Sequence, residues 1–319
     1  MNSISLKGSG YALSIHNNEP SRDPKVGEGQ NGIRCWKSKD APHLSPIALS
    51  WLNLEHVVTQ DQQFFGNRKD PGFFEPRQYP IQLTKADNCI RLSHDPLPRT
   101  GCSCWIEYTP GNRANSLDFQ IGFTPTQKVG SGNAIGLFLP CYIYQPENKS
   151  VHFIGCSQSN RKKRWIEYCS SCHRSAINFA SHTTQHPPTY ESTNFQQVLE
   201  IARYCYPFFT GQVGNYTLIL MLDGGSDFEV RFWMSPEGGG WNPETHLTNP
   251  PWDFVILRIG YDINREYTAR GRLIFGPLKT KLAEAIFQFL IIFYLLEISA
   301  PSLHTESPHA GISPFVPLR

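Results

Sequence analysis

Short segments in which apolar and polar residues alternate dominate the chain from about residue 88 onward. Most of them are about four to eight residues long and are bounded by Gly, Pro, Asn or Asp, a pattern typical of β-strands. We predict strands at 88–93, 104–109, 117–123, 134–139, 141–145, 151–156, 164–169, 215–222, 228–234, 253–261 and 271–276. This pattern favours a two-sheet sandwich over a fold in which strands and helices alternate.

Two other segments have helical spacing. Ser45 and Pro46 supply an N-cap and a proline at the first helical position, which predicts a short helix over 46–58. An alternating pattern through Leu49 and Trp51 leaves a strand as the alternative there. A second helix is predicted to begin at Thr193, where Thr and Gln have capping-box spacing, and to end before Pro207.

The two ends of the chain lack the strand pattern. We expect residues 1–40 to be a loosely ordered arm and the sandwich domain to span 41–282. Residues 283–298 read AEAIFQFLIIFYLLEI, which is too short for a typical membrane-spanning helix of about 20 residues. We predict a buried C-terminal helix there, with a membrane contact as the alternative, and a disordered tail over 299–319.

Composition supports this reading of the ordered part. Aromatic residues are 13% of the chain, whereas charged residues are 18%, below the usual ~25%. This balance excludes a largely disordered chain, because disordered chains have few aromatic residues and many charged ones. The net charge of +2 argues against a general nucleic-acid binder, so we expect no nucleic-acid partner.

The later strands resemble the concanavalin A-like, laminin-G-like superfamily of jelly-roll sandwiches. The similar segments are YTLILMLDGGSDFEVRFWM at 216–234, WDFVILRIGYDI at 252–263 and GRLIFGPLK at 271–279, with FQIGF and NAIGLFL upstream. The resemblance implies a sandwich whose concave sheet or rim loops often bind glycans. We therefore expect an all-β fold, a two-sheet antiparallel jelly-roll sandwich with one or two short helices and a C-terminal helix.

A glycan site needs aromatic faces and polar groups that bind hydroxyls. The stretch from Trp233 to Asn264 contains several of both kinds, whereas Trp233 and Tyr261 lie within strands and are expected to fill the core. The residues that we predict to bind the ligand are Trp241, Trp252, Asp262 and Asn264.

Catalysis would need a pair of carboxyl groups about 5–9.5 Å apart. Glu107 and Glu229 each stand alone on a predicted strand, so the sequence shows no such pair and no catalytic residue can be assigned. We expect a carbohydrate-binding module without its own catalytic centre. The alternatives are a polysaccharide lyase or hydrolase on the same fold, using a carboxylate such as Glu107 or Glu229, and an intracellular protein-interaction domain.

The nine cysteines are an odd number, and the N-terminus has no secretory signal. Both features fit reduced thiols, so we expect a cytoplasmic protein. We expect no cofactor. A zinc site is kept as an open alternative, because thiolates and imidazole are the usual ligands of structural zinc; its four ligands would be Cys156, Cys169, Cys172 and His173.

Overall fold

The computed structural model describes a β-sandwich. The described residues are 2–19, 29–59, 75–129, 134–156, 163–169, 178–179, 203–223, 228–234, 240 and 242–277. All of them belong to one compact unit, Met1–Leu278. The predicted C-terminal helix and tail lie outside the described residues, as do positions 193–202 of the predicted second helix. The end of that predicted helix is wrong, because Arg203–Tyr204 form a β-strand.

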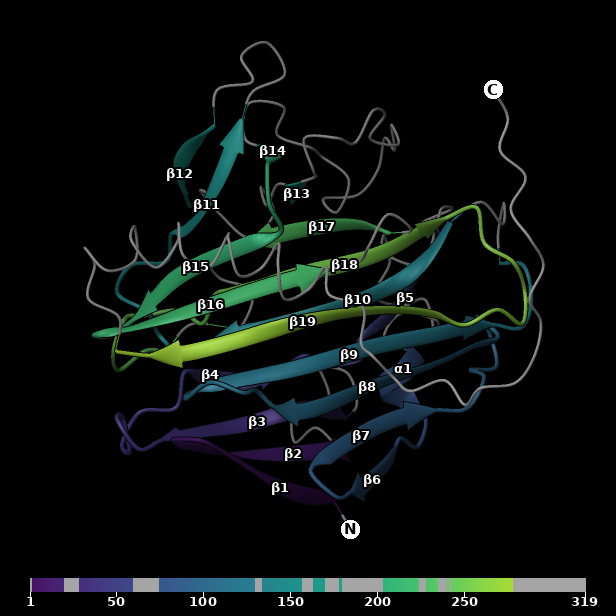
Figure 1. The fold of residues 1–319 in the computed structure, drawn as a ribbon, viewed down its shortest axis with the longest axis horizontal. Coiled ribbons are helices and arrows are strands. Elements are labelled where there is room, and N and C mark those ends of the chain that lie inside the picture. The colour runs from purple at the N-terminus through teal and green to yellow at the C-terminus, as the bar shows by residue number, and fades with distance from the viewer. Residues whose placement is uncertain are drawn as a thin grey trace, which may run out of the picture. The chain divides into compact units, whose positions relative to one another are not determined.

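The first sheet, sheet A, has nine strands within the described residues, and its neighbouring strands are antiparallel (Figure 1). Its order is β1-β2-β3-β4-β10-β18-β17-β13, and β5 also pairs with β10. The strands are β1 Ser3–Gly8, β2 Tyr11–Glu19, β3 Gln30–Ser38, β4 Ile47–Trp51, β5 His56–Thr59, β10 Ala134–Ile143, β13 Asn178–Phe179, β17 Glu229–Met234 and β18 Pro251–Ile259.

The second sheet, sheet B, is also antiparallel and has ten strands within the described residues. Its order is β12-β11-β15-β16-β19-β9-β8-β7-β6, and β14 pairs with β11. The strands are β6 Gln82–Ala86, β7 Cys89–His94, β8 Cys102–Pro110, β9 Ser116–Pro125, β11 Val151–Cys156, β12 Arg164–Tyr168, β14 Arg203–Tyr204, β15 Phe208–Val213, β16 Tyr216–Asp223 and β19 Tyr267–Gly276.

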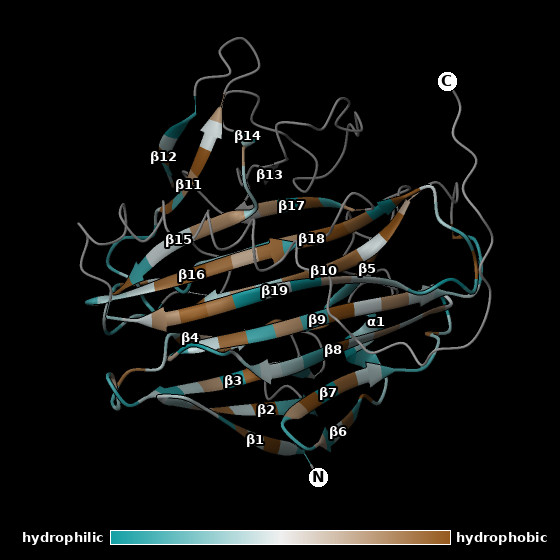
Figure 2. Cartoon of the chain, viewed as in Figure 1, coloured by the Kyte–Doolittle hydropathy of each residue, from teal (hydrophilic) through white to brown (hydrophobic). Residues whose placement is uncertain are grey.

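The core lies between the two sheets, because successive side chains of a strand point to opposite faces. Hydropathy alternates accordingly along β9 (Figure 2). Aromatic pairs join the layers: Phe209 of sheet B stacks on Phe232 of sheet A with ring centroids 3.8 Å apart. The Tyr108 hydroxyl also donates to the Leu52 carbonyl at 3.0 Å. The predicted two-sheet antiparallel sandwich is confirmed.

The expectation of a loosely ordered N-terminal arm is wrong. Three strands, β1, β2 and β3, lie in this part of the chain and extend sheet A beyond β4. Tyr11, Leu13 and Ile15 alternate with more exposed residues and are buried in the core. This alternation is the strand signal, and the polar stretch around 20–28 hid it in the sequence.

The predicted helix over 46–58 is also wrong, and the strand alternative holds. Residues 47–51 form β4 and residues 56–59 form β5, and both strands pair with β10. Trp51 and Val57 are buried on the core side. Burial of these bulky side chains against the opposite sheet therefore overrides the helical cap at Ser45 and Pro46.

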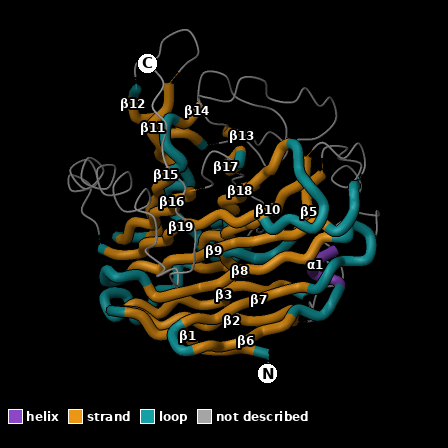
Figure 3. Tube along the Cα trace, turned by 45° about the vertical axis from the view of Figure 1, so that its right-hand side comes forward, coloured by secondary structure: helices purple, strands orange, loops and turns teal. Residues whose placement is uncertain are grey.

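The described residues contain one helix, α1 at Glu75–Gln78, which lies to one side of the strands (Figure 3). They contain no helix with the length and apolarity that crossing a membrane requires.

Candidate functional site

The predicted ligand residues do not come together in the structure. Trp252 belongs to the core between the two sheets, where its ring packs against Phe232 with ring centroids 5.7 Å apart. Its burial follows from its place at the start of β18, where it faces the opposite sheet. Tyr261 is buried as expected, and Trp241 lies outside the described residues.

Asp262 and Asn264 lie in the exposed loop between β18 and β19. The Asp262 carboxylate contacts Arg265 at 3.4 Å, and Asn264 adopts a left-handed conformation with φ 59°. Along β18, roughly 23 Å separates Trp252 from Ile259, after which this loop begins. The two loop residues and Trp252 are therefore at opposite ends of the strand.

The zinc hypothesis fails on strand register. Val151 pairs with Tyr168 and Gly155 with Arg164, so Cys156 and Cys169 lie at opposite ends of the β11–β12 pair, roughly 20 Å apart. Cys172 and His173 lie outside the described residues. Within the described part of the chain, no group of three or more His, Cys, Asp or Glu side chains is placed to hold a metal ion.

The two single carboxylates do not form a pair either. Glu229 accepts a hydrogen bond from Arg231 Nε at 2.6 Å on β17 of sheet A. Glu107 lies on β8 of sheet B, opposite Gln120.

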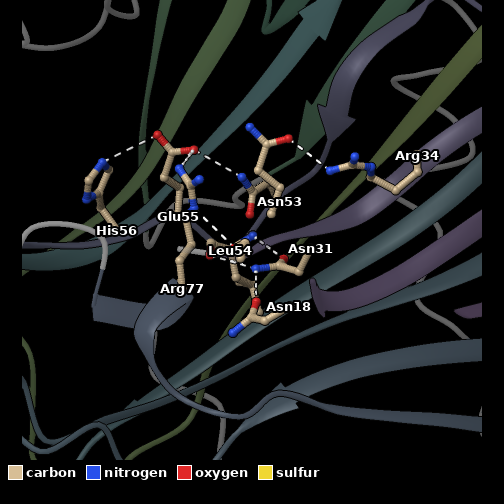
Figure 4. A network of polar contacts seen from close by, with 10 residues as sticks. Asn18, Asn31, Arg34, Asn53, Leu54, Glu55, His56 and Arg77 are labelled. Carbon is tan, nitrogen blue, oxygen red and sulfur yellow. Dashed lines mark hydrogen bonds and ion pairs between the residues drawn. The ribbon is translucent and has the colours of Figure 1, made fainter. Parts of the chain in front are cut away.

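A different set of polar residues is gathered beside β10. We call Asn53, Glu55, His56, Arg77 and Asp253 the Glu55 cluster. Figure 4 shows the first four of them. All five side chains are buried.

A gap in strand pairing creates the place for this cluster. β4 pairs with β10 at Cys141 and Ile143, whereas β5 pairs with it from Phe138 to Ile135. Pro140, which cannot donate to a ladder, lies between these two stretches. The segment 52–55 crosses there from β4 to β5, and the backbone N–H of Glu55 donates to the Phe138 carbonyl.

Three side chains surround the Glu55 carboxylate. Asn53 Nδ2 donates to Oε2 at 3.0 Å, and Arg77 Nη1 donates to the same oxygen at 3.3 Å. His56 Nε2 lies 3.5 Å from Oε1. Two donors to one oxygen fix the carboxylate in position.

A second layer of amides holds the segment that carries Glu55. Asn31 Oδ1 accepts from the Leu54 N–H at 2.9 Å, and Asn31 Nδ2 donates to the Leu54 carbonyl at 3.1 Å. Asn31 Nδ2 also reaches Asn18 Oδ1 at 2.9 Å. The side chain of Asn31 thus pairs with the peptide as a neighbouring strand would, which makes β2 and β3 part of the site's support.

The helix α1 presents Arg77 to Glu55. Glu75 accepts from the backbone N–H groups of Arg99 and Thr100 at 2.7 and 3.2 Å, which ties the start of the helix to that loop. Arg77 Nε donates to the Gly29 carbonyl at 3.2 Å. The Arg77 guanidinium is therefore held by two contacts, one to the Gly29 carbonyl and one to the Glu55 carboxylate.

Asp253 is the second carboxyl group of the cluster. Trp252 and Phe254 face the core, so Asp253 points to the outer face of sheet A. It is only 4% exposed, and its Oδ1 has no hydrogen-bond partner within the described structure. Burial, and then the nearby charge of Glu55, raise the pKa of Asp253 well above its ordinary value. Both effects favour the protonated, neutral form of this carboxyl group.

His56 lies on the same outer face, 5.3 Å from the ring centroid of Phe138. Burial lowers the pKa of His56, while its contact with Glu55 acts in the opposite direction. The imidazole is consequently neutral at physiological pH.

The cluster combines hydrogen-bond acceptors with possible proton donors. A carboxylate near a carboxyl group whose neutral form is favoured pairs an acceptor with a donor, an arrangement that acid–base sites use. Asn53 Oδ1 is a further buried acceptor with no partner within the described structure. Phe138, Val58 and Val255 supply apolar surface on the same face.

The sequence analysis missed most of this cluster. Glu55 and His56 lay inside the segment read as a helix. Asp253 had a recognisable signal, a single acid within the otherwise apolar strand WDFVIL, and such a residue is almost never fully buried without a role or a partner.

Comparisons with known proteins support the fold. A scan with protein-family models gives no match, and neither does a comparison with curated proteins. Among solved structures, an α-N-acetylgalactosaminidase from Bifidobacterium bifidum, solved as a GalNAc complex, is 11% identical with a TM-score of 0.50, over 93% of this chain and 39% of that one.

Two smaller proteins match over nearly their whole length. An aldose 1-epimerase candidate from Escherichia coli K12 is 8% identical with a TM-score of 0.48, over 86% of this chain and 99% of that one. A galactose mutarotase-like protein from Lactobacillus casei ATCC 334 is 9% identical with a TM-score of 0.45, over 85% and 99%.

None of these three is named as a concanavalin A-like or jelly-roll protein. The resemblance noted in the sequence is confirmed only as far as a two-sheet antiparallel sandwich. Over most of its described length, the chain shares the fold of the bifidobacterial α-N-acetylgalactosaminidase structure.

Proposed function

We propose that this protein binds a sugar on the outer face of sheet A, at the Glu55 cluster. The observation that carries the proposal is a carboxylate held by Arg77 near a second buried carboxyl group, Asp253, whose Oδ1 lacks a partner within the described structure. A buried polar atom without a partner costs about 1–3 kcal/mol, which a bound hydroxyl offsets.

A sugar fits this set better than an anion does. A hydroxyl both donates and accepts, so neighbouring hydroxyls can satisfy Glu55, Asn53 Oδ1 and Asp253 at once. An anionic ligand offers acceptors only, and it would meet a carboxylate whose neighbouring guanidinium is already paired. The α-N-acetylgalactosaminidase that shares the fold was solved with GalNAc, so GalNAc is a suitable first ligand.

The test is calorimetric titration of the full chain with GalNAc, galactose and glucose. We expect Glu55→Gln and Asp253→Asn each to weaken binding at least about tenfold, the effect of roughly 1.4 kcal/mol. Asp262→Asn makes the same chemical change in the exposed loop, and we expect wild-type affinity. The proposal is wrong if no sugar binds, or if Asp262→Asn loses affinity while the two cluster variants keep it. Trp241 stays a prediction as a rim contact.

The alternative of a carbohydrate-active enzyme has one observation in its favour. Glu55 and Asp253 are two buried carboxyl groups close enough for the charge of Glu55 to raise the pKa of Asp253. Such a pair can take a proton from one atom of a sugar and give one to another, as hydrolysis and interconversion of anomers both require. Release of reducing ends from polysaccharides, and anomer exchange followed by NMR, test these reactions. Activity in the wild type that both Glu55→Gln and Asp253→Asn abolish would establish the enzyme, whereas binding without activity would leave a lectin-like protein.

A further inference from the structure

Two cysteines that the sugar site does not use lie on neighbouring strands. β11 and β14 are antiparallel, with Gly155 opposite Tyr204 and Cys156 opposite Arg203. The pairing extends by one residue, because the N–H of Cys205 donates to the Ile154 carbonyl at 2.7 Å. Residues two apart on a strand share a face, so Cys156 and Cys205 are diagonal neighbours on one face.

The side chains of this pair are in contact. The Cys156 thiol hydrogen-bonds to that of Cys205, and both residues are buried, with exposed fractions of 4% and 8%. Cys102 and Cys104 are also buried, but they lie two residues apart on the single extended strand β8, which holds their Cβ atoms too far apart for a bond.

A cation lies beside the pair. The Lys163 ammonium interacts electrostatically with both thiols, and it donates to the Tyr206 hydroxyl next to Cys205. A neighbouring ammonium favours the thiolate, the form that attacks a disulfide.

We propose that Cys156 and Cys205 form a disulfide that joins β11 to β14 when the protein meets a low-molecular-weight disulfide such as oxidised glutathione. One cysteine sulfur attacks the small disulfide, forms a mixed disulfide and releases one small thiol. The second cysteine sulfur then attacks the protein-side sulfur of that mixed disulfide and releases the other small thiol. The two cysteines lose two hydrogens in total, and the oxidant becomes two thiols.

The surroundings set the rate and the permanence of this bond. Burial raises the pKa of Cys205 to about 12, and this outweighs the effect of Lys163. The thiolate is therefore scarce and the bond forms slowly. A thiol of high pKa is also a poor leaving group, so the disulfide is reduced slowly. These properties fit a bond that stabilises the fold better than one that switches rapidly.

Mass spectrometry of the full chain after incubation with oxidised glutathione tests this inference. We expect a peptide pair linked through Cys156 and Cys205, two hydrogens lighter than the two thiol peptides together, and a higher Tm that a phosphine reductant reverses. Cys156→Ser and Cys205→Ser should each abolish the link and the rise in Tm, whereas Cys102→Ser should leave both unchanged.

The exposed Cys169 reports whether the oxidant has reached the protein. The inference is overturned if Cys169 becomes glutathionylated while Cys156 and Cys205 remain thiols through complete reaction of Cys169 and prolonged incubation. It is also overturned if both carry separate glutathione adducts without joining. Neither result depends on whether a sugar binds at the Glu55 cluster.

Discussion

Arg77 Nη1 lies 3.3 Å from Glu55 Oε2, and both side chains are almost completely buried, with exposed fractions of 2% and 5%. A pair of this kind is costly to break, because removing one member leaves the other charge buried without compensation. This relationship leads to the first of four predictions.

Arg77→Gln should lower the free energy of unfolding by about 3–5 kcal/mol, since it leaves the Glu55 carboxylate buried without its cation. Urea denaturation at pH 7 measures the change. The matched control is Arg270→Gln, which breaks the exposed pair with Asp223 at 3.7 Å and should cost less than about 1 kcal/mol. Equal losses in the two variants would mean that the Arg77 pair is no stronger than a surface contact.

Asp253 should make stability fall as pH rises. Its pKa in the folded state is raised above its ordinary value of 3.8, so the folded protein holds a proton that the unfolded chain releases. The contribution is complete below about pH 4 and is lost as pH rises toward the folded pKa, with a limiting slope of about 1.4 kcal/mol per pH unit. Asp253→Asn should flatten the unfolding free energy between pH 4 and 8, whereas Asp262→Asn should not. An unchanged slope in Asp253→Asn would show that Asp253 is ionised in the folded protein.

His94 should make the stability of the fold decrease as pH falls, the opposite of the effect of Asp253. Burial lowers its pKa from 6.5 to about 4, so the unfolded chain binds a proton that the folded protein does not. Stability is therefore lost as pH falls from about 6.5 through about 4, by up to about 3 kcal/mol. His94→Gln should remove this loss when unfolding is followed in urea over that range, and His43→Gln at an exposed position should retain it. If His94→Gln were as acid-sensitive as the wild type, other groups would be responsible.

Gly211→Ala should destabilise the sandwich by about 1–3 kcal/mol. A Cβ at this position would lie 2.4 Å from Cζ2 of Trp252, which is confined in the core. Gly276→Ala, where the nearest atom would be 3.6 Å away, should change stability by less than about 0.5 kcal/mol. Thermal and urea unfolding compare the two variants, and a tolerated Gly211→Ala would show that Trp252 has room to move.

Most strands after residue 88 could be predicted because they have their own alternating pattern and turn residues, but β15 at Phe208–Val213 was not predicted. Two predicted strands, 134–139 and 141–145, join into the single strand β10, since Pro140 interrupts hydrogen bonding without ending the strand. The strands before residue 60 were missed for local reasons. A polar stretch near residue 20 suggested an arm, and the cap at Ser45 suggested a helix.

The Glu55 cluster could not be predicted from the sequence, for a different reason. Its members come from positions 53–56, 77 and 253, and they meet only because β10 pairs with β5 on one side and with β18 on the other. This register depends on the whole of sheet A, and no local spacing encodes it. The predicted loop residues Asp262 and Asn264 are near each other in sequence, so they could be chosen from local spacing. Local spacing does not show which residues from distant parts of the chain lie beside them.

The three N-terminal strands also shield the rest of sheet A. β3 pairs with β4 at Ile33 and Trp51, so a chain that began at residue 40 would leave β4 as a bare edge with unpaired backbone groups. Exposed edges of this kind recruit other strands and promote aggregation. Such a chain would also lack Asn31, which holds the Leu54 peptide next to Glu55. Any shortened version of this protein should therefore keep its first forty residues.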